Sequence, residues 1–457
     1  MINRILLAAL SSGSGKTFLT CGLLKALKNR KISTRAYKCG PDYIDPMFHK
    51  RVLGIPGGNL DTWFSRPEDI RARLMREVQP GEIAVIEGVM GYYDGLGGVS
   101  TQASSYDVAK ATNTPVILIL DGKGVSLSIV SAAKGICQYK EDSRIAGVII
   151  NRMNPALGEK LRPAFKEQGI ELLGCVPDCP QWKWDSRHLG LVMPKEQENI
   201  NEILNELAGC MEQYVNIDRI LEISSKALDM EEILKPEKAV FIEKEHVNIG
   251  VAMDLAFCFY YQENLDFLES LGARLQFFSP LSDKALPENV CGLLLGGGYP
   301  ELYADRLWKN TSMRQAILKA AQNGMPISGE CGGFLYLQEQ LEGEDGRIYP
   351  MTGVLPGTSV RKEKLGRFGY IELTAKRNAG WVKEGDQIKG HEFHYWDSDC
   401  CGDVFHSKKP VGDRQWDCIQ SRYCVVAGFP HLYYPSNPSY GKGFVDACRR
   451  WKESQNK

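Results

Sequence analysis

The chain alternates short apolar runs with stretches of helical pattern, and this alternation restricts the folds it can form. In the first half the runs are "RILLAAL" at 4–10, "EIAVIEG" at 82–88, "PVILILDG" at 115–122 and "IAGVIINR" at 145–152. Continuous apolar runs of this length indicate strands buried on both faces, and strands that alternate with helices pair in parallel. We therefore predict an α/β fold with ligand sites at the carboxyl ends of parallel strands.

The same pattern divides the chain into two α/β domains. Its 457 residues exceed what one hydrophobic core usually organises. A second series of apolar runs, including "VNIGVAMD" and "CGLLLGGG", follows a charged stretch of helical pattern that holds Pro236. We predict one parallel-sheet domain at 1–195, a helical joint at 196–245 and a second α/β domain at 246–457.

The stretch "LSSGSGKT" at 10–17 lies between the first apolar run and a helical pattern, which is the setting that a Walker A phosphate loop requires. Backbone N–H groups of such a loop and the positive end of the next helix receive phosphate oxygens. Leu10 stands where the standard pattern has its first Gly. The residues predicted to bind ATP are Gly13, Ser14, Gly15, Lys16 and Thr17, with Lys16 on the outer phosphates and Thr17 on magnesium.

Two further segments, "KCGPDYIDP" and "VIEGVMGYYDG", carry acidic side chains at or just beyond predicted strand ends: Asp42, Asp45, Glu87 and Asp94. Magnesium prefers oxygen ligands, with one or two carboxylates and retained waters. We predict that Thr17, Asp42 and Glu87 contact this ion. For each acid the alternative is a loop carboxylate that caps a turn.

Cys331 stands at a turn in "MPISGECGGFLYL", between a short apolar run and a helical pattern. A reactive side chain at a strand-to-helix turn is the geometry of a nucleophile elbow. The glycines permit the sharp turn, and the helix N-terminus is expected to lower the thiol pKa and to offer N–H groups to an oxyanion. We predict that Cys331 is a catalytic nucleophile rather than a packed thiol.

A nucleophilic thiol needs a base, and the chain has seven histidines. His431 follows the apolar run "VVAGFP", whereas His391 and His394 in "GHEFHY" lie among aromatic and acidic residues that suit substrate contact. We choose His431 as the base and keep the other two as alternatives. Gly297 and Gly298, in "LLLGGGYPELY", are predicted to supply N–H groups to the oxyanion hole.

Composition excludes several classes of protein. A hydrophobic content of 43% with a net charge of −1 is ordinary for a globular chain and gives no reason to expect a nucleic-acid partner. No run reaches the roughly 20 apolar residues of a membrane span, and the N-terminus lacks the cleavage site of a signal peptide. Fourteen cysteines without disulfide or zinc spacing fit a reducing compartment, so we expect a cytoplasmic protein.

The motifs resemble the cobyrinic acid a,c-diamide synthase family along nearly the whole chain. They are the phosphate loop, "YKCGPDYIDPMFH", "NLDTWF", "IEGVMGYYDG", "RHLGLV", "LLLGGGYPELYAD", "GECGGFLYL", "PMTGVLPG" and "GHEFHY". The resemblance implies a dethiobiotin-synthetase-like P-loop domain joined to a class I glutamine amidotransferase domain of the triad type. Glutamine is then hydrolysed at Cys331, with His431 as its base.

The resemblance also implies that ATP and magnesium activate the a and c acetate carboxylates of a corrinoid as acyl phosphates, which ammonia converts to amides. Lys38, Asp45 and Asp94 are expected at the substrate or acyl-phosphate site. Many class I glutaminases carry Glu two positions after the catalytic His, where this chain has Tyr433, so the third triad member stays open. The implied partners are glutamine, ATP and a tetrapyrrole, and a homodimer is one of the oligomeric states left open.

Two rival interpretations remain at this stage. The same chemistry can act on hydrogenobyrinic acid or nickel sirohydrochlorin, which close relatives of the family handle. A non-enzymatic ATPase switch of the partitioning type resembles the phosphate loop, but carries a signature lysine at the position of Ser11. Such a switch has no use for a thiol at an elbow.

Overall fold

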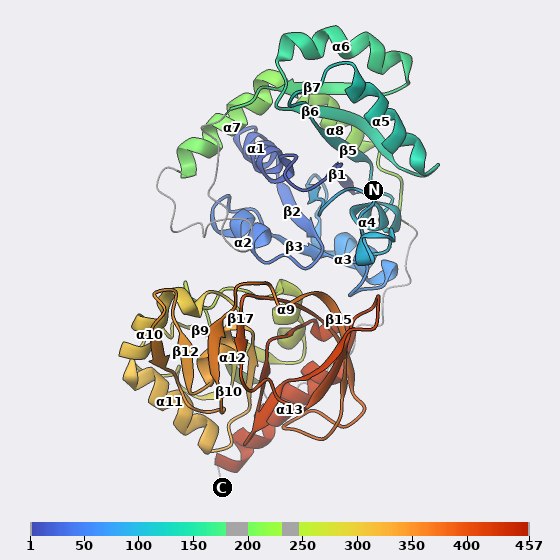
Figure 1. Cartoon of the computed structure of the whole chain (residues 1–457). Coiled ribbons are helices and arrows are strands. Elements are labelled where there is room, and N and C mark those ends of the chain that lie inside the picture. Colours follow the sequence, from blue (N-terminus) through green and yellow to red (C-terminus); the bar gives the residue numbers. More distant parts are fainter. Residues whose placement is uncertain (1, 180–199, 231–245, 456–457) are drawn as a thin grey trace. The chain divides into compact units, whose positions relative to one another are not determined.

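The computed structural model describes residues 2–179, 200–230 and 246–455. Two compact units make up the chain, Met1–Lys238 and Ala239–Lys457, each with its own sheet and core (Figure 1). The motif "RHLGLV" at 187–192 lies outside the described residues.

A seven-stranded parallel sheet in the order β3-β2-β4-β1-β5-β6-β7 forms the centre of the first unit. The strands are β1 (Asn3–Ala9), β2 (Thr34–Cys39), β3 (Gly57–Leu60), β4 (Ile83–Glu87), β5 (Val116–Asp121), β6 (Ile145–Asn151) and β7 (Leu172–Val176). Because β1, β2 and β4 run in parallel near the centre, the loops that follow them meet at one edge.

The helices of the first unit flank this sheet. They are α1 (Lys16–Asn29), α2 (Ile44–Arg51), α3 (Pro67–Glu77), α4 (Ser105–Ala111), α5 (Ser128–Tyr139), α6 (Pro155–Glu167), α7 (Ile200–Tyr214) and α8 (Ile217–Ser225).

Strand β1 shows why an unbroken apolar run becomes a central strand. Ile5, Leu7 and Ala9 pack into the core on one face of the sheet, and Leu6 and Ala8 pack into the core on the other. Side chains of a strand alternate between its faces, so a strand covered on both sides is apolar along its buried length. After Asn3 and Arg4 at its start, β1 is apolar to Ala9, and polar residues return at Ser11, where the phosphate loop begins.

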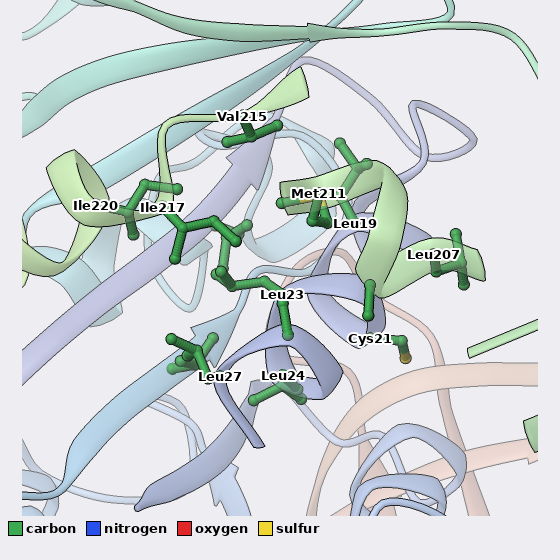
Figure 2. Close-up of a cluster of buried hydrophobic side chains, with 14 of the residues drawn as sticks. Leu19, Cys21, Leu23, Leu24, Leu27, Leu207, Met211, Val215, Ile217 and Ile220 are labelled. Carbon is green, nitrogen blue, oxygen red and sulfur yellow. The ribbon is translucent and has the colours of Figure 1, made fainter. Parts of the chain in front are cut away.

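Helices α7 and α8 belong to the core of the first unit. Figure 2 shows side chains of α1 in one cluster with Leu207 and Met211 of α7 and Ile220 of α8. At Gly22 of α1 a β-carbon would lie 2.9 Å from Met211 Cγ, so the absent side chain lets α7 approach closely. The described part of the predicted joint at 196–245 is therefore helical and packs on α1.

The second unit is built on a six-stranded sheet in the order β20-β21-β11-β10-β8-β9, parallel except for β20. Its strands are β8 (Val247–Ala252), β9 (Ala273–Phe278), β10 (Val290–Leu295), β11 (Ile327–Glu330), β20 (Gln420–Arg422) and β21 (Val425–Gly428). Its helices are α9 (Gln262–Ser270), α10 (Ala304–Lys309), α11 (Thr311–Gln322), α12 (Gly332–Leu337) and α13 (Pro438–Gln455).

Two smaller sheets complete this unit. One has the order β13-β12-β14-β17 and the other is antiparallel, with the order β19-β18-β15-β16-β22. Their strands are β12 (Gln340–Glu342), β13 (Ile348–Pro350), β14 (Thr358–Arg361), β15 (Arg367–Ala375), β16 (Gln387–His394), β17 (Trp396–Ser398), β18 (Phe405–Lys408), β19 (Gln415–Cys418) and β22 (His431–Leu432).

The predicted fold class, two α/β domains with parallel sheets, is confirmed. The two smaller sheets are an addition that the apolar runs did not predict, because their strands alternate buried and exposed positions, as β15 does over Ile371–Ala375. Within the described ranges no helix has the length and apolar character needed to cross a membrane.

Candidate active sites

The phosphate loop of the first unit leads from β1 into α1, as predicted. Gly15 precedes the helix in the left-handed region, with a φ of 93°. A β-carbon there would lie 2.1 Å from Asn151 Nδ2, and that amide donates a hydrogen bond of 3.0 Å to the carbonyl of Ser14. Only glycine fits both the conformation and the space. Strand β6, through Asn151, thus braces the loop.

Lys16 is buried at the start of α1, and its ammonium group donates to the carbonyls of Ser11 at 3.1 Å and Met90 at 2.5 Å. Burial, and then the nearby charge of Lys38, lower its pKa to about 8. Two loop carbonyls therefore hold the amine in this structure.

A buried charge cluster lies beside the loop, where β2 and β4 end. Lys38 Nζ donates to Glu87 Oε1 at 2.7 Å and also bonds Asp45, and the Thr17 hydroxyl donates to the same Glu87 oxygen at 2.6 Å. Burial and the charge of Asp45 raise the pKa of Glu87 to about 7. Burial opposes ionisation of Asp45 too, but the charge of Lys38 holds the pKa of Asp45 below its usual value.

Asp42 and Asp94 have clear structural roles near this cluster. Asp42 Oδ1 accepts the N–H groups of Ile44 at 2.8 Å and Asp45 at 3.1 Å, so it caps the start of α2. Asp94 Oδ2 accepts the N–H of Gly91 at 2.9 Å and holds the loop after β4. These contacts of Asp42 and Asp94 match the alternative given in the sequence analysis, in which each acid is a loop carboxylate that caps a turn.

The side-chain oxygens at this place suit a magnesium ion that binds together with a nucleotide. They are too few for a metal ion held by protein ligands alone. Within the described residues no three His, Cys, Asp or Glu side chains are grouped to hold a metal ion. Thr17 and Glu87 of the predicted set are in contact, and Glu87 Oε2 is buried without a hydrogen-bond partner. Two protein oxygens beside phosphates and waters match the usual ligands of this ion.

Sequence reasoning missed His49 in this cluster. Its buried ring lies with Nε2 3.8 Å from Glu87 Oε2, and burial lowers the pKa of His49 to about 4. Its position in "DPMFH", one turn after Asp45 on α2, is the signal that could have found it.

In the second unit Cys331 occupies a strained turn between β11 and α12. Its φ of 47° and ψ of −103° are unusual for any residue with a side chain, and its N–H donates to the carbonyl of Gly428 at 2.8 Å. Strain of this kind is kept only where the surrounding structure enforces it, and it is common at catalytic turns. The predicted strand–turn–helix geometry is present.

The expected lowering of the thiol pKa is wrong for this site. Burial and then the charge of Glu301 raise the pKa of Cys331, and the N–H of Gly332 opposes this by a smaller amount. Helix α12 has only six residues, and the Cys331 thiol before it is shielded from water. The effect of desolvation on the thiol pKa therefore outweighs that of the helix N-terminus. A thiol of this kind stays protonated until a base removes the proton.

His431 lies beside the predicted oxyanion-hole glycines. A β-carbon on Gly297 would lie 2.3 Å from His431 Cε1, so only glycine permits the ring at this position. A β-carbon on Gly332 would lie 3.0 Å from the backbone nitrogen of Gly298. The Gly297–Gly298 segment therefore contacts the histidine on one side and the turn after Cys331 on the other.

Glu330 is a residue of this site that sequence reasoning missed. Its Oε2 lies 3.9 Å from His431 Nδ1, and its Oε1 accepts the Tyr434 hydroxyl at 2.9 Å. Burial raises the pKa of Glu330 to about 8 and lowers that of His431 to about 3. A carboxylate as the last residue of a buried strand, directly before the thiol, was the available signal.

The two rival histidines are both buried near this site. His391 is paired directly with His431 across β16 and β22, and burial lowers its pKa to about 3. His394 stacks on Phe429 with ring centroids 3.9 Å apart, and its Nδ1 donates to the carbonyl of Trp396 at 2.6 Å. Of the three, His431 is the ring that contacts Gly297 and Glu330.

Comparison with known families matches both halves of the chain. Residues 5–192 match the family described as the CobQ/CobB/MinD/ParA nucleotide binding domain. Residues 248–413 match the CobB/CobQ-like glutamine amidotransferase domain. The phosphate loop falls in the first match and Cys331 in the second.

Curated relatives match over nearly the full length. Proteins named cobyrinate a,c-diamide synthase are 35% identical in Thermoplasma volcanium, over 99% of both chains, and 35% identical in Caldanaerobacter subterraneus, over 98% of this chain and 99% of that one. In Listeria monocytogenes serotype 4b the identity is 40% over 90% of this chain and 89% of the relative. The chain belongs to the cobyrinate a,c-diamide synthase family, a family of ligases that join a nucleotide-binding domain to a glutamine amidotransferase domain.

Proposed function

We propose that the protein uses ATP and glutamine to convert the a and c acetate carboxylates of cobyrinic acid to amides. The observation that carries the proposal is the strained Cys331 turn, with His431 and Glu330 beside it, in a chain whose other unit holds a phosphate loop. The names of the relatives support the substrate.

In the glutaminase reaction, the Cys331 sulfur attacks the side-chain amide carbon of glutamine while His431 takes the thiol proton. The imidazolium formed in this way then gives the proton to the departing ammonia, and water hydrolyses the thioester. The low pKa of His431 keeps its ring neutral and able to accept a proton at physiological pH. Backbone N–H groups of Gly297 and Gly298 are proposed to receive the oxyanion, a role supported by their place beside the Cys331 turn.

Glu330 is proposed as the third member of this triad. The position two residues after the histidine is Tyr433, which supplies no carboxylate, whereas Glu330 reaches the ring from the adjacent strand. An ionised Glu330 facing Nδ1 would stabilise the imidazolium that forms when the thiol loses its proton. Tyr434 holds the carboxylate in place from its other side.

In the synthetase reaction, a substrate carboxylate oxygen attacks the γ-phosphorus of ATP and ADP leaves. Ammonia then attacks the acyl carbon and phosphate leaves. Gly13, Ser14, Gly15 and Lys16 are proposed to hold the phosphates. Magnesium, bound at Thr17 and Glu87, would neutralise phosphate charge. Lys38, Asp45 and Asp94 are proposed to border the reacting carboxylate.

Two alternatives concern the substrate and the class of function. Hydrogenobyrinic acid and nickel sirohydrochlorin carry comparable acetate groups and stay as alternative substrates. A non-enzymatic partitioning-type switch is disfavoured by the thiol turn and by Ser11 at the position of that class's signature lysine. Release of ammonia from glutamine separates a glutaminase from such a non-enzymatic switch.

Replacing Cys331 by Ala should abolish glutamine-dependent amidation and leave amidation from free ammonia near normal, because the acyl phosphate needs only a nitrogen nucleophile. Both rates can be measured on one preparation. Cys424→Ala, which removes a half-buried thiol of the same unit, is the matched control and should change neither rate. A Cys331→Ala protein that kept its glutamine-dependent rate would make Cys331 a packed thiol.

Affinity for ATP should fall as pH rises through about 8. The pKa of Lys16 in the empty loop is about 8, so below this value the amine is charged and above it binding has to take up a proton. Calorimetric titrations in buffers of different ionisation enthalpy measure both effects. Lys16→Ala should bind weakly without this pH dependence, whereas the exposed Lys31→Ala should behave as wild type. Constant wild-type affinity from pH 7 to about 9.5 would contradict this role of Lys16.

Glu330→Gln should lower kcat/KM for glutamine by roughly 10²-fold and leave ammonia-dependent amidation unchanged. Because the pKa of Glu330 is about 8, the wild-type kcat/KM should rise with pH through that value and the variant should lack this rise. Exposed Glu344→Gln is the control. If Glu330→Gln kept the same rise, another group, such as the Cys331 thiol, would be the one that ionises.

A further inference from the structure

Glu392 of β16 is a buried carboxylate that the reactions above do not use. Its side chain is fully buried, and neither carboxylate oxygen has a hydrogen-bond partner in the part of the chain that the structure describes. The nearest basic atom recorded is His394 Nε2, at 3.8 Å from Oε2. A buried carboxylate without partners is costly, so such a group in a native fold calls for a cationic ligand.

Arg367 lies next to Glu392 on the same face of the antiparallel sheet. It stands directly opposite His394, and Gly369 stands directly opposite Glu392, so β15 places no side chain over the carboxylate at that position. The Nη2 of Arg367 contacts Cys401 Sγ at 3.4 Å and Asp397 Oδ1 at 3.5 Å, but its Nη1 is buried without a hydrogen-bond partner.

A second cation borders the same space. Lys409 Nζ would lie 3.2 Å from a β-carbon on Gly369, and it donates to the carbonyls of Phe368 and Tyr370 rather than to Glu392. Burial lowers its pKa to about 8, and the charge of Glu392 opposes that shift. One carboxylate thus has two basic groups near it, and no ion pair to either is recorded.

This group of charges is close to the nucleophile. Phe429 follows Gly428, whose carbonyl accepts the Cys331 N–H. The Phe429 ring stacks on His394, and the Arg367 guanidinium lies 5.9 Å from its centroid. The charge of Glu392 is among the causes that raise the pKa of Cys331, which agrees with this proximity.

We propose that Glu392 and Arg367 form a subsite for the amino-acid end of glutamine, with Glu392 receiving the α-ammonium group and Nη1 of Arg367 receiving the α-carboxylate. A buried acid and a half-buried base, each with unused hydrogen-bonding atoms on one sheet face, match the two opposite charges that a free amino acid carries on one carbon. The inference rests on the proposed glutaminase activity and assigns its substrate selectivity to these two side chains.

Three substrates separate the two contacts. Glutaramate lacks the α-ammonium group of glutamine, and 4-aminobutanamide lacks the α-carboxylate. Ammonia release is measured with each compound for wild type, Glu392→Gln and Arg367→Gln. The control is Glu372→Gln, an exposed carboxylate of the same sheet. Binding of glutamine to Cys331→Ala by calorimetry, with and without each further substitution, gives a readout that does not need turnover.

We expect Glu392→Gln to lower kcat/KM for glutamine by roughly 10²-fold and to leave that for glutaramate within about twofold of wild type. Arg367→Gln should show the mirror pattern, with 4-aminobutanamide as the unaffected compound. Ammonia-dependent amidation should persist in both variants, because the first unit performs it. Unchanged kcat/KM with the unaffected compound shows that the second unit is folded in each variant. Glu372→Gln should match wild type with every compound.

Equal losses with glutamine and glutaramate in Glu392→Gln would overturn the inference, because the carboxylate would then support the fold or His394. Wild type that used glutaramate as well as glutamine would also overturn it. A failure of the proposed function looks different: no ammonia is released by wild type, and Cys331→Ala binds no glutamine.

Discussion

The parallel pairing of β11 with β21 is the constraint on which the glutaminase site depends. Its register places Glu330 opposite Gly428, and the next N–H, that of Cys331, bonds the Gly428 carbonyl. Residues about a hundred positions apart in sequence are thereby brought to one sheet edge. The strained backbone of Cys331 persists because the strand before it and the helix after it are both fixed in the core.

The first unit uses the same principle with a buried ion cluster in place of a thiol. Strands β2 and β4 are neighbours, so Lys38 and Glu87 are directly paired in register and their side chains meet beside Thr17 of α1. The positive charge of Lys38 lets the two carboxylates of Asp45 and Glu87 lie in one buried cluster. In the second unit the buried carboxylate of Glu392 also has basic groups nearby, but no hydrogen bond to them is recorded. We propose that Glu392, whose oxygens have no hydrogen-bond partner among the described residues, marks the place where the second unit accepts a charged ligand.

Sequence reasoning worked where the signal was local. The phosphate loop and the thiol elbow each consist of consecutive residues between a strand and a helix, and both have the predicted geometry. It worked less well where the surrounding fold decides the pKa or the contacts of a side chain. The thiol pKa is raised because burial outweighs a short helix end. The predicted magnesium contact of Asp42 stays a prediction, since the recorded contacts of its Oδ1 are with two N–H groups at the start of α2. The surroundings of Glu330, His49 and Glu392 come from neighbouring strands and helices, which the order of residues does not reveal.

One chain is proposed both to release ammonia from glutamine and to use it. The most direct test supplies ATP, magnesium, cobyrinic acid and glutamine labelled with ¹⁵N at the side-chain amide, with this glutamine as the only nitrogen source. Mass spectrometry of the product then counts the amides and their label. We expect two amides, both labelled, and none without ATP. Unlabelled amides, or no amidation of cobyrinic acid under conditions in which glutamine is hydrolysed, would contradict the account.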